Sequence, residues 1–398
     1  MEDKVPGFGP PLVSIVITNF NYGRFLQDAV ASVSAQTYPR IECVIVDDAS
    51  TDDSPAIIEA LAQRTPGLKL ALHETNRGQS MAFRTGLLAS RGEYVVFLDA
   101  DDMLFPRFVE THIFVHLSSR RAVGFTSSDM VQSKGRHVVT SAWERMNRYI
   151  VSGRGRRSGL LRRIDACAPD VWPMTSDGFD DIESRVHFVG TTHEWEDWIY
   201  APTSGNCFRR EALELLLGDD GVEALRFHSD NYVNKGACLL CGAILIDLPL
   251  FVYRFHDRNG FIDHPELHGF HGANMSKAGR ADQIAWRMLV DRLIADAAPL
   301  VAKVGLQRYA EMLATLQRAS AMIPELSDVP GAESYIATKL RGVSAKEGHV
   351  DRRFLRRVIE IERRRRRRIR RVAEFFLTMG RFFHASAISA LGERLWRA

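Results

Sequence analysis

Short apolar runs that end in acidic residues are the feature that most constrains how this chain can fold. Residues 93–98 (EYVVFL) lead into Asp99-Ala100-Asp101, and residues 41–46 (IECVIV) lead into Asp47-Asp48. Such runs are typical of strands buried in a parallel sheet, and ligands bind outside the carboxyl ends of those strands. We therefore expect both acidic groups at one crevice. A hard divalent cation holding a phosphorylated ligand would relieve the repulsion between them.

Strand and helix patterns alternate along the first part of the chain. The strands are predicted at residues 12–18, 41–46, 68–72, 94–98 and 123–127, and the helices at 25–36, 54–63, 79–89 and 105–117. This alternation predicts an α/β fold in which a mostly parallel, Rossmann-like sheet carries helices on both faces. Two late strands are predicted at 244–247 and 250–253, separated by Pro249, and from about residue 277 a helical pattern runs to the end.

Composition limits the compartment and the class of protein. Apolar residues make up 45% and charged residues 25% of the 398, as in water-soluble globular proteins. No stretch of about 18 apolar residues predicts a spanning helix, and the polar start Met1-Glu2-Asp3-Lys4 does not resemble a secretory signal. The five cysteines have no disulfide-framework spacing, which favours a reducing compartment. We therefore expect a cytoplasmic location.

The positive charge is concentrated near the C-terminus. Residues 351–371 hold twelve arginines against three acidic residues, so the rest of the chain carries a net charge of −6 within a total of +3. Aromatic and aliphatic residues at helical spacing follow the arginines. Two interpretations stay open for residues 351–398: a helix packed on the domain, or a peripheral anchor on an anionic membrane surface. A nucleic-acid partner is not expected, because that role needs the charges but not the aromatic helix.

Several motifs, in this order and spacing, resemble glycosyltransferase family 2, the inverting enzymes of the GT-A fold. The resemblance covers roughly residues 11–257. Its motifs are VSIVITNFN at residues 13–21, SAQTYP at 34–39, VIVDDASTD at 44–52, NRG at 76–78, FLDADD at 97–102, and a looser YRFH at 253–256. The resemblance implies a nucleotide-sugar donor, UDP-linked in our expectation, and Mn²⁺ or Mg²⁺ as cofactor.

The same resemblance implies roles for individual residues. Asp101 and His256 would bind the metal, and Asp230 would be the general base. The donor would be held by Thr18, Asn19, Asp47, Asp48, Asn76, Arg77, Gly78 and Asp99. Ser229 stands where the family has Glu before its catalytic Asp, and Asp230 can also be interpreted as an ordinary helix N-cap.

We therefore expect a GT-A domain at 1–260, with an acceptor-side insertion at about 130–205, and a helical C-terminal region at 261–398. The expected reaction is transfer of one sugar to a hydroxyl of a glycan or lipid-linked acceptor, as in cell envelope polysaccharide synthesis. Two alternatives stay open. One is a nucleotidyltransferase that makes a nucleotide sugar, although the segment 19–24 (NFNYGR) is a poor triphosphate loop. The other is a non-catalytic protein of the same fold that binds sugar nucleotides or glycans.

Overall fold

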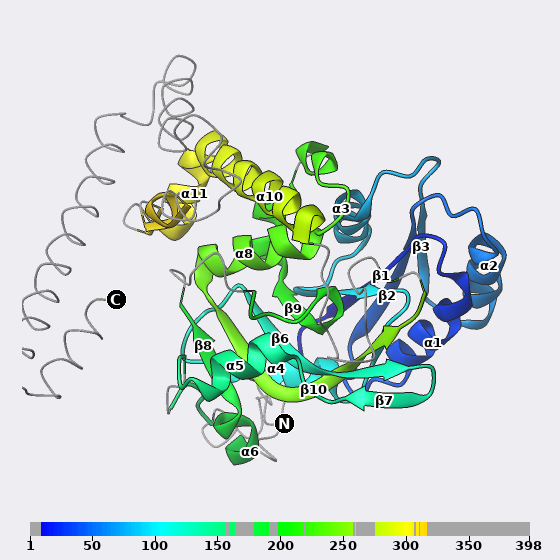
Figure 1. Ribbon diagram of the computed structural model, residues 1–398, viewed down its shortest axis with the longest axis horizontal. Helices are drawn as coiled ribbons and strands as arrows, with labels where there is room; N and C mark the ends of the chain where they lie inside the picture. The colour runs from blue at the N-terminus through cyan, green and yellow to red at the C-terminus, as the bar shows by residue number, and fades with distance from the viewer. Residues whose placement is uncertain are drawn as a thin grey trace, which may run out of the picture. The chain divides into compact units, whose positions relative to one another are not determined.

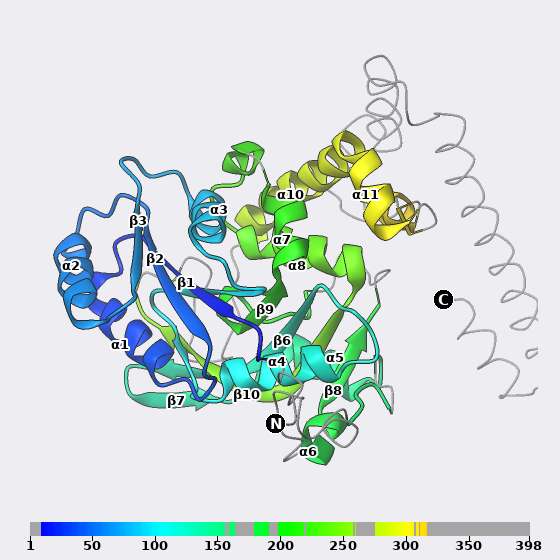
Figure 2. The same cartoon turned by 180° about the vertical axis from the view of Figure 1, so that it is seen from behind.

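The computed structural model describes residues 9–155, 159–163, 179–190, 198–218, 220–257, 259, 275–305, 308–309 and 311–316. The chain divides into two compact units, Met1–Leu289 and Val290–Ala398. The first unit contains the sheet, and its arrangement is shown from two sides in Figures 1 and 2. The division that we expected near residue 260 and the acceptor-side insertion stay predictions. The arginine-rich segment 351–398 lies outside the described residues.

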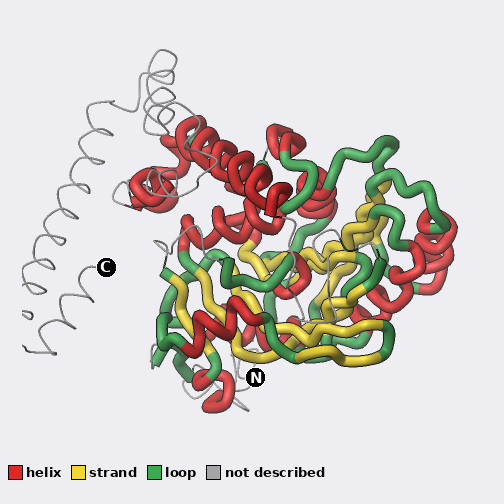
Figure 3. The backbone as a smooth tube through the Cα atoms, in the orientation of Figure 1, coloured by secondary structure: helices red, strands yellow, loops and turns green. Residues whose placement is uncertain are grey.

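Ten strands of the described chain form one mixed sheet, drawn in yellow in Figure 3. Their order is β3-β2-β1-β4-β9-β6-β10-β5, with β7 on β6 and β8 on β10. The strands are β1 (Val13–Asn19), β2 (Ile41–Asp47), β3 (Lys69–Leu72), β4 (Tyr94–Asp99), β5 (Met103–Leu104), β6 (Phe125–Lys134), β7 (His137–Thr140), β8 (Val186–Val189), β9 (Asn206–Arg209) and β10 (Ala243–Phe255).

The helices follow the strands as the sequence predicts over the first 120 residues. They are α1 (Gly23–Ser34), α2 (Ser54–Arg64), α3 (Gln79–Ala89), α4 (Phe108–Ser118), α5 (Glu144–Val151), α6 (Phe179–Ser184), α7 (Arg210–Leu217), α8 (Ser229–Cys241), α10 (Met275–Ala295) and α11 (Ala297–Val304), with short 3₁₀ turns η1 (Thr203–Gly205) and η2 (Asp220–Ala224). The α/β prediction is confirmed. Within the predicted helical region 261–398, α10 and α11 are described, and the remainder of that prediction lies largely outside the described residues. None of the described helices combines the length and the apolarity needed to cross a membrane.

The strand order places a topological switch point between β1 and β4. The chain runs outward from β1 through β2 to β3, then returns to the other side of β1 to form β4. Since crossovers between parallel strands are right-handed, the reversal sends α3 to the face opposite α1 and α2, as Figures 1 and 2 show. Ligands of open α/β sheets bind at such a point. The carboxyl ends of β1 and β4 are Asn19 and Asp99.

Helix α3 packs closely on β1. A Cβ atom on Gly86 would lie 2.1 Å from Cγ1 of Val16, so glycine is needed for this approach. The rings of Phe83 on α3 and Phe97 on β4 stack with centroids 4.0 Å apart, and both are fully buried. The N-terminus of α3 is thereby fixed above the ends of β1 and β4.

The prediction of two strands on either side of Pro249 is wrong. One strand, β10, runs through the proline, and its pairing with β6 shifts register on both sides of Pro249. Proline has no N–H to give to a ladder and is tolerated at such a bulge. Beyond the bulge, Tyr253 to Phe255 stay paired with β6, so that His256 follows the strand directly.

Candidate active site

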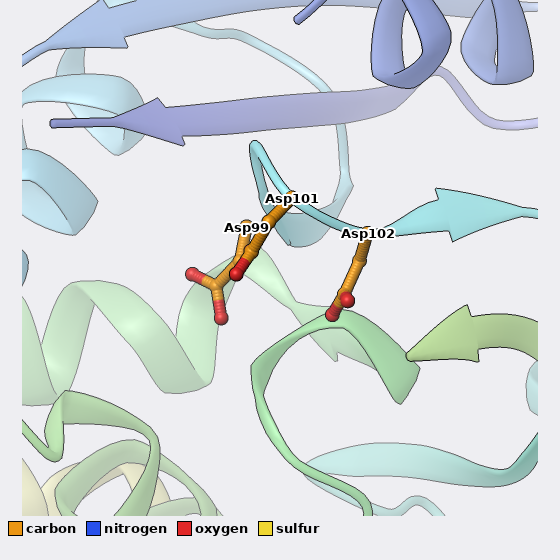
Figure 4. A group of neighbouring side chains, drawn as sticks. All are labelled: Asp99, Asp101 and Asp102. Carbon is orange, nitrogen blue, oxygen red and sulfur yellow. The ribbon is translucent and has the colours of Figure 1, made fainter. Parts of the chain in front are cut away.

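Three aspartates gather just beyond the end of β4. Asp99 ends the strand, and Asp101 and Asp102 lie in the loop to β5. One carboxylate oxygen from each lies within 4.8 Å of the other two, and Figure 4 shows the three side chains on the same side of the loop. We call Asp99, Asp101 and Asp102 the acidic cluster. The sequence analysis gave no role to Asp102, although it is adjacent to Asp101 in the FLDADD motif.

Burial and repulsion from neighbouring carboxylates disfavour the charged forms of Asp99 and Asp102. Burial, followed by the charges of Asp101 and Asp230, raises the pKa of Asp99 to about 7. Burial, followed by the charges of Asp101 and Asp99, raises the pKa of Asp102 well above its usual range. Burial first, and the neighbouring carboxylates second, therefore favour the protonated forms of Asp99 and Asp102 in the absence of a cation.

Hydroxyl and amide groups from distant segments contact the cluster. Oδ1 of Asp99 accepts hydrogen bonds from Thr18 Oγ1 at 3.2 Å and Gln79 Nε2 at 3.3 Å. Ser204, in η1, donates from Oγ to Asp102 Oδ2 at 2.6 Å and accepts the backbone N–H of Asp99 at 3.2 Å. These neutral donors orient the carboxylates but do not neutralise them.

Residues at the end of β10 also contact the acidic cluster. Nε2 of His256 lies 2.8 Å from Asp101 Oδ2, so the two predicted metal ligands are neighbours. Their binding of a metal stays a prediction. Arg254 is buried, donates from Nε to the main-chain oxygen of Asp101, and pairs with Asp28 on α1 at 2.7 Å. Its backbone N–H donates to Asp102 Oδ1 at 3.2 Å. The sequence analysis did not assign Arg254 a role.

Two aromatic side chains at the start of α1, those of the N-cap residue Tyr22 and of Phe25, hold the His256 ring. The ring centroid of His256 lies 4.9 Å from that of Phe25 and 5.3 Å from that of Tyr22, which packs edge-on. The guanidinium of Arg254 lies over the Phe25 ring, 4.7 Å from its centroid. The imidazole is therefore confined beside Asp101.

The acidic cluster is chemically suited to a hard divalent cation. It offers closely spaced, incompletely neutralised carboxylate oxygens, which are the ligands that Mg²⁺ and Mn²⁺ prefer. His256 adds a nitrogen donor at the edge of the group. With Nε2 hydrogen bonded to Asp101, His256 would join a metal only after exchanging that bond.

Asp230 lies in the first turn of α8. Its charge contributes to the raised pKa of Asp99, and burial raises the pKa of Asp230 itself. The N-cap position of α8 is His228, in a left-handed conformation with φ 60°, so Asp230 is not the N-cap. Ser229 is fully buried, and its hydroxyl pairs with that of Ser80 at 2.6 Å.

Asp47 and Asp48 bind protein donors instead of joining the acidic cluster. Asp47 accepts Asn19 Nδ2 at 2.6 Å and both the N–H and the hydroxyl of Ser50 at 2.9 and 2.7 Å. Asp48 accepts the N–H groups of Arg77 and Gly78, each at 2.8 Å, and lies 2.6 Å from His73 Nδ1. Both carboxylates therefore shape the loops after β2 and β3. Their predicted contact with the nucleoside stays a prediction.

The loop after β3 contacts the segment before α8. The guanidinium of Arg77 pairs with Glu223 of η2, with Nε 3.3 Å from Oε1, and Asn76 accepts hydrogen bonds from Arg226. Of the tryptophans noted in the expected acceptor-side insertion, Trp143 is 2% exposed and Trp198 is half-buried, whereas Trp172 and Trp195 lie outside the described residues.

Comparison with known proteins confirms the family resemblance. Residues 14–168 match the family described as Glycosyl transferase family 2. An uncharacterized glycosyltransferase of Nostoc, alr2836, is 33% identical over 252 residues, which cover 62% of this chain and 66% of that protein. The uncharacterized glycosyltransferase EpsJ of Bacillus subtilis is 36% identical over 248 residues, 61% of each chain. This chain thus spans slightly less than two thirds of the length of both relatives.

Solved structures with a similar chain path include two glycosyltransferases. Staphylococcus aureus TarS 1–349 in complex with UDP aligns with a TM-score of 0.42 at 18% identity, covering 89% of this chain and 91% of that one. The mannosyltransferase PcManGT from Pyrobaculum calidifontis, in complex with GDP-Man and Mn²⁺, aligns with a TM-score of 0.40 at 20% identity, covering 90% of each chain.

The raised pKa of Asp99 predicts that divalent cation binding depends on pH. Below about pH 7 the carboxyl holds a proton that a cation must displace, so acid weakens binding. We expect the Kd for Mn²⁺, measured by electron paramagnetic resonance, to rise about tenfold for each pH unit below 7, as displacement of one proton requires. A Kd that stays constant between pH 8 and pH 6 would contradict this assignment.

Proposed function

We propose, from the match of residues 14–168 to glycosyltransferase family 2, that the protein transfers a single sugar from a nucleotide-diphosphate sugar to a hydroxyl group. The proposed donor is UDP-linked, the acceptor is a glycan or a lipid-linked glycan, and the anomeric carbon is inverted. The observation that carries the proposal is the acidic cluster at the sheet's switch point, with Asp230 near enough for its charge to help raise the pKa of Asp99.

The acidic cluster is the proposed site for the diphosphate end of the donor. Asp101, with Asp99, Asp102 and His256, would hold Mn²⁺ or Mg²⁺, which supplies neutralisation of the charge on the leaving nucleoside diphosphate. Thr18 and Ser204 would keep Asp99 and Asp102 oriented, as they do through the hydrogen bonds described above. Asp47, Asp48 and the loop Asn76–Gly78 would border the nucleoside.

Asp230 is the proposed general base. As the acceptor oxygen forms its bond to the anomeric carbon, the bond from that carbon to the diphosphate oxygen breaks, and the acceptor proton passes to the Asp230 carboxylate. Burial raises the pKa of Asp230, which makes it a stronger base than an exposed aspartate. Direct attack by the acceptor from the face opposite the leaving group accounts for inversion.

Substitution of Asp101 and of Asp230 should separate donor binding from transfer. Asp101→Asn should weaken UDP binding by about 10–100-fold in saturating Mn²⁺ and leave metal-free binding unchanged, since ligand loss acts only through the cation. Asp230→Asn should keep UDP binding and lower the transfer rate by about 10²–10⁴-fold. Titration calorimetry with UDP measures the affinity, and the rate of UDP release from UDP-sugars measures transfer.

Asp129→Asn is the matched control for Asp230→Asn. Asp129 is also buried with a raised pKa, but its carboxylate binds the N–H groups of Met130 and Trp143 and the Asn147 amide. Its substitution should lower stability and leave the rate per folded molecule unchanged.

Equal UDP binding by Asp101→Asn and wild type in Mn²⁺ would refute the metal site. Full transfer by Asp230→Asn would refute the base. Release of pyrophosphate from a nucleoside triphosphate and a sugar phosphate would instead favour a nucleotidyltransferase.

For residues 351–398 we propose peripheral attachment to an anionic membrane at its cytoplasmic face. The support is the sequence alone: six consecutive arginines at 363–368, followed by an aromatic amphipathic pattern. Each basic residue near an anionic surface contributes about 1 kcal/mol.

The full chain should therefore float with phosphatidylglycerol-containing vesicles at low salt and stay unbound with neutral phosphatidylcholine vesicles. Replacement of the arginines at 363–368 by glutamine should abolish flotation and leave UDP binding intact. Failure of the wild-type chain to float at low salt would leave a packed helix as the interpretation of this segment.

A further inference from the structure

Residues Gly78–Ser80, at the start of α3, lie directly against Arg226–Ser229, at the start of α8. A Cβ atom on Gly78, whose φ is +87°, would lie 2.7 Å from the Cα atom of Arg226. The backbone N–H of Gln79 donates to the Arg226 oxygen at 2.8 Å, and the hydroxyls of Ser80 and Ser229 pair at 2.6 Å. The two helix starts are therefore held at a fixed separation.

The Gln79 side chain connects this junction to the acidic cluster. Its Oε1 accepts the backbone N–H of Ser229 at 3.2 Å. Its Nε2 donates to Asp99 Oδ1 at 3.3 Å and lies 3.5 Å from Thr203 Oγ1. One neutral amide thus contacts both a cluster carboxylate and the helix turn that carries Asp230.

The start of α8 needs such a restraint. His228 takes a left-handed conformation at φ 60°, which is unfavourable for a residue other than glycine and persists only when the surrounding structure enforces it. Asp230 accepts the N–H of its neighbour Asn231 at 2.9 Å, so the position of its carboxylate follows the helix turn. Asp99 and Asp230 also repel each other when charged.

We infer that Gln79 is a positioning residue that fixes Asp99 relative to the first turn of α8 and so sets the placement of Asp230 against the acidic cluster. This inference rests on the proposed function for the role of Asp230. An amide suits the task because it donates with one end and accepts with the other and adds no charge to an anionic site. A carboxylate at this position would add repulsion beside Asp99.

Gln79→Met tests the inference because it keeps the length of the side chain and removes both hydrogen bonds. We expect kcat for release of the nucleoside diphosphate to fall by about 10–100-fold, as for loss of a residue that orients a metal ligand, with a smaller change in the donor KM. The Mn²⁺ Kd, read by electron paramagnetic resonance without donor, should rise in the same variant. The donor is whichever of UDP-glucose, UDP-galactose, UDP-GlcNAc and GDP-mannose reacts fastest with the wild type.

Gln36→Met is the matched control. Gln36 is also half-buried and uses both ends of its amide, donating to the oxygens of Ser32 and Phe105 and accepting the N–H of Val109. Gln36→Met should lose about as much thermal stability as Gln79→Met and keep the kcat and the Mn²⁺ affinity of the wild type. Gln79→Glu keeps the acceptor oxygen for the Ser229 N–H, and its kcat should also fall below that of the wild type. If Gln79→Met does not fold, the kcat of Gln79→Glu decides the test.

Wild-type kcat or Mn²⁺ affinity in Gln79→Met, a loss confined to the donor KM, or an equal loss of kcat in Gln36→Met would each overturn the inference. If the wild type releases nucleoside diphosphate from none of the donors, the proposed function fails instead. The Mn²⁺ titration of the Gln79 variants still decides whether Gln79 orients Asp99.

Discussion

Repulsion among carboxylates that share a largely buried space is the interaction on which the site is built. Asp99 ends β4, Asp101 and Asp102 lie in the loop that follows, and the charge of Asp230 adds to theirs. Such a group is unfavourable in the absence of a cation, so the protein restrains it with hydrogen bonds from several sides. Thr18, Ser204 and Gln79 supply neutral donors, and Arg254 holds the loop through its main chain.

The sheet topology explains why these partners meet. Reversal of the chain after β3 brings β4 beside β1, which places Thr18 and Asp99 at adjacent strand ends. The bulge at Pro249 lets β10 continue beyond it, and its end delivers Arg254 and His256. Helix α3, packed closely on β1 through Gly86, then supplies Gln79. Each partner of the cluster therefore depends on a feature of the backbone rather than on a local motif.

The sequence predicted the features that local pattern determines. The parallel strands before Asp47 and Asp99 and the helices between them follow from apolar runs and periodicity, and Asp99 and Asp101 follow from their place at a strand end. Contacts between residues far apart in the chain could not be predicted in this way. Asp48 binds loop N–H groups 29 and 30 residues further on, and Gln79 bonds to a residue 150 positions away. Nothing in the pattern around residue 79 distinguishes it from an ordinary first-turn residue.

The measurement that tests the central claim most directly is the thermal stability of Asp99→Asn with and without Mn²⁺. Because the pKa of Asp99 is raised from 3.8 to about 7 on folding, its ionisation lowers stability progressively as the pH rises from about 4 to about 7, and the loss is complete above that. Asparagine removes the charge and keeps an acceptor oxygen for Thr18. At pH 8 without metal, the variant should melt higher than the wild type, by about 1–2 °C for each kcal/mol of relief in a chain of this size. Mn²⁺ should raise the melting temperature of the wild type and have little effect on the variant. A variant that melts below the wild type without metal, or a wild type insensitive to Mn²⁺, would contradict the account.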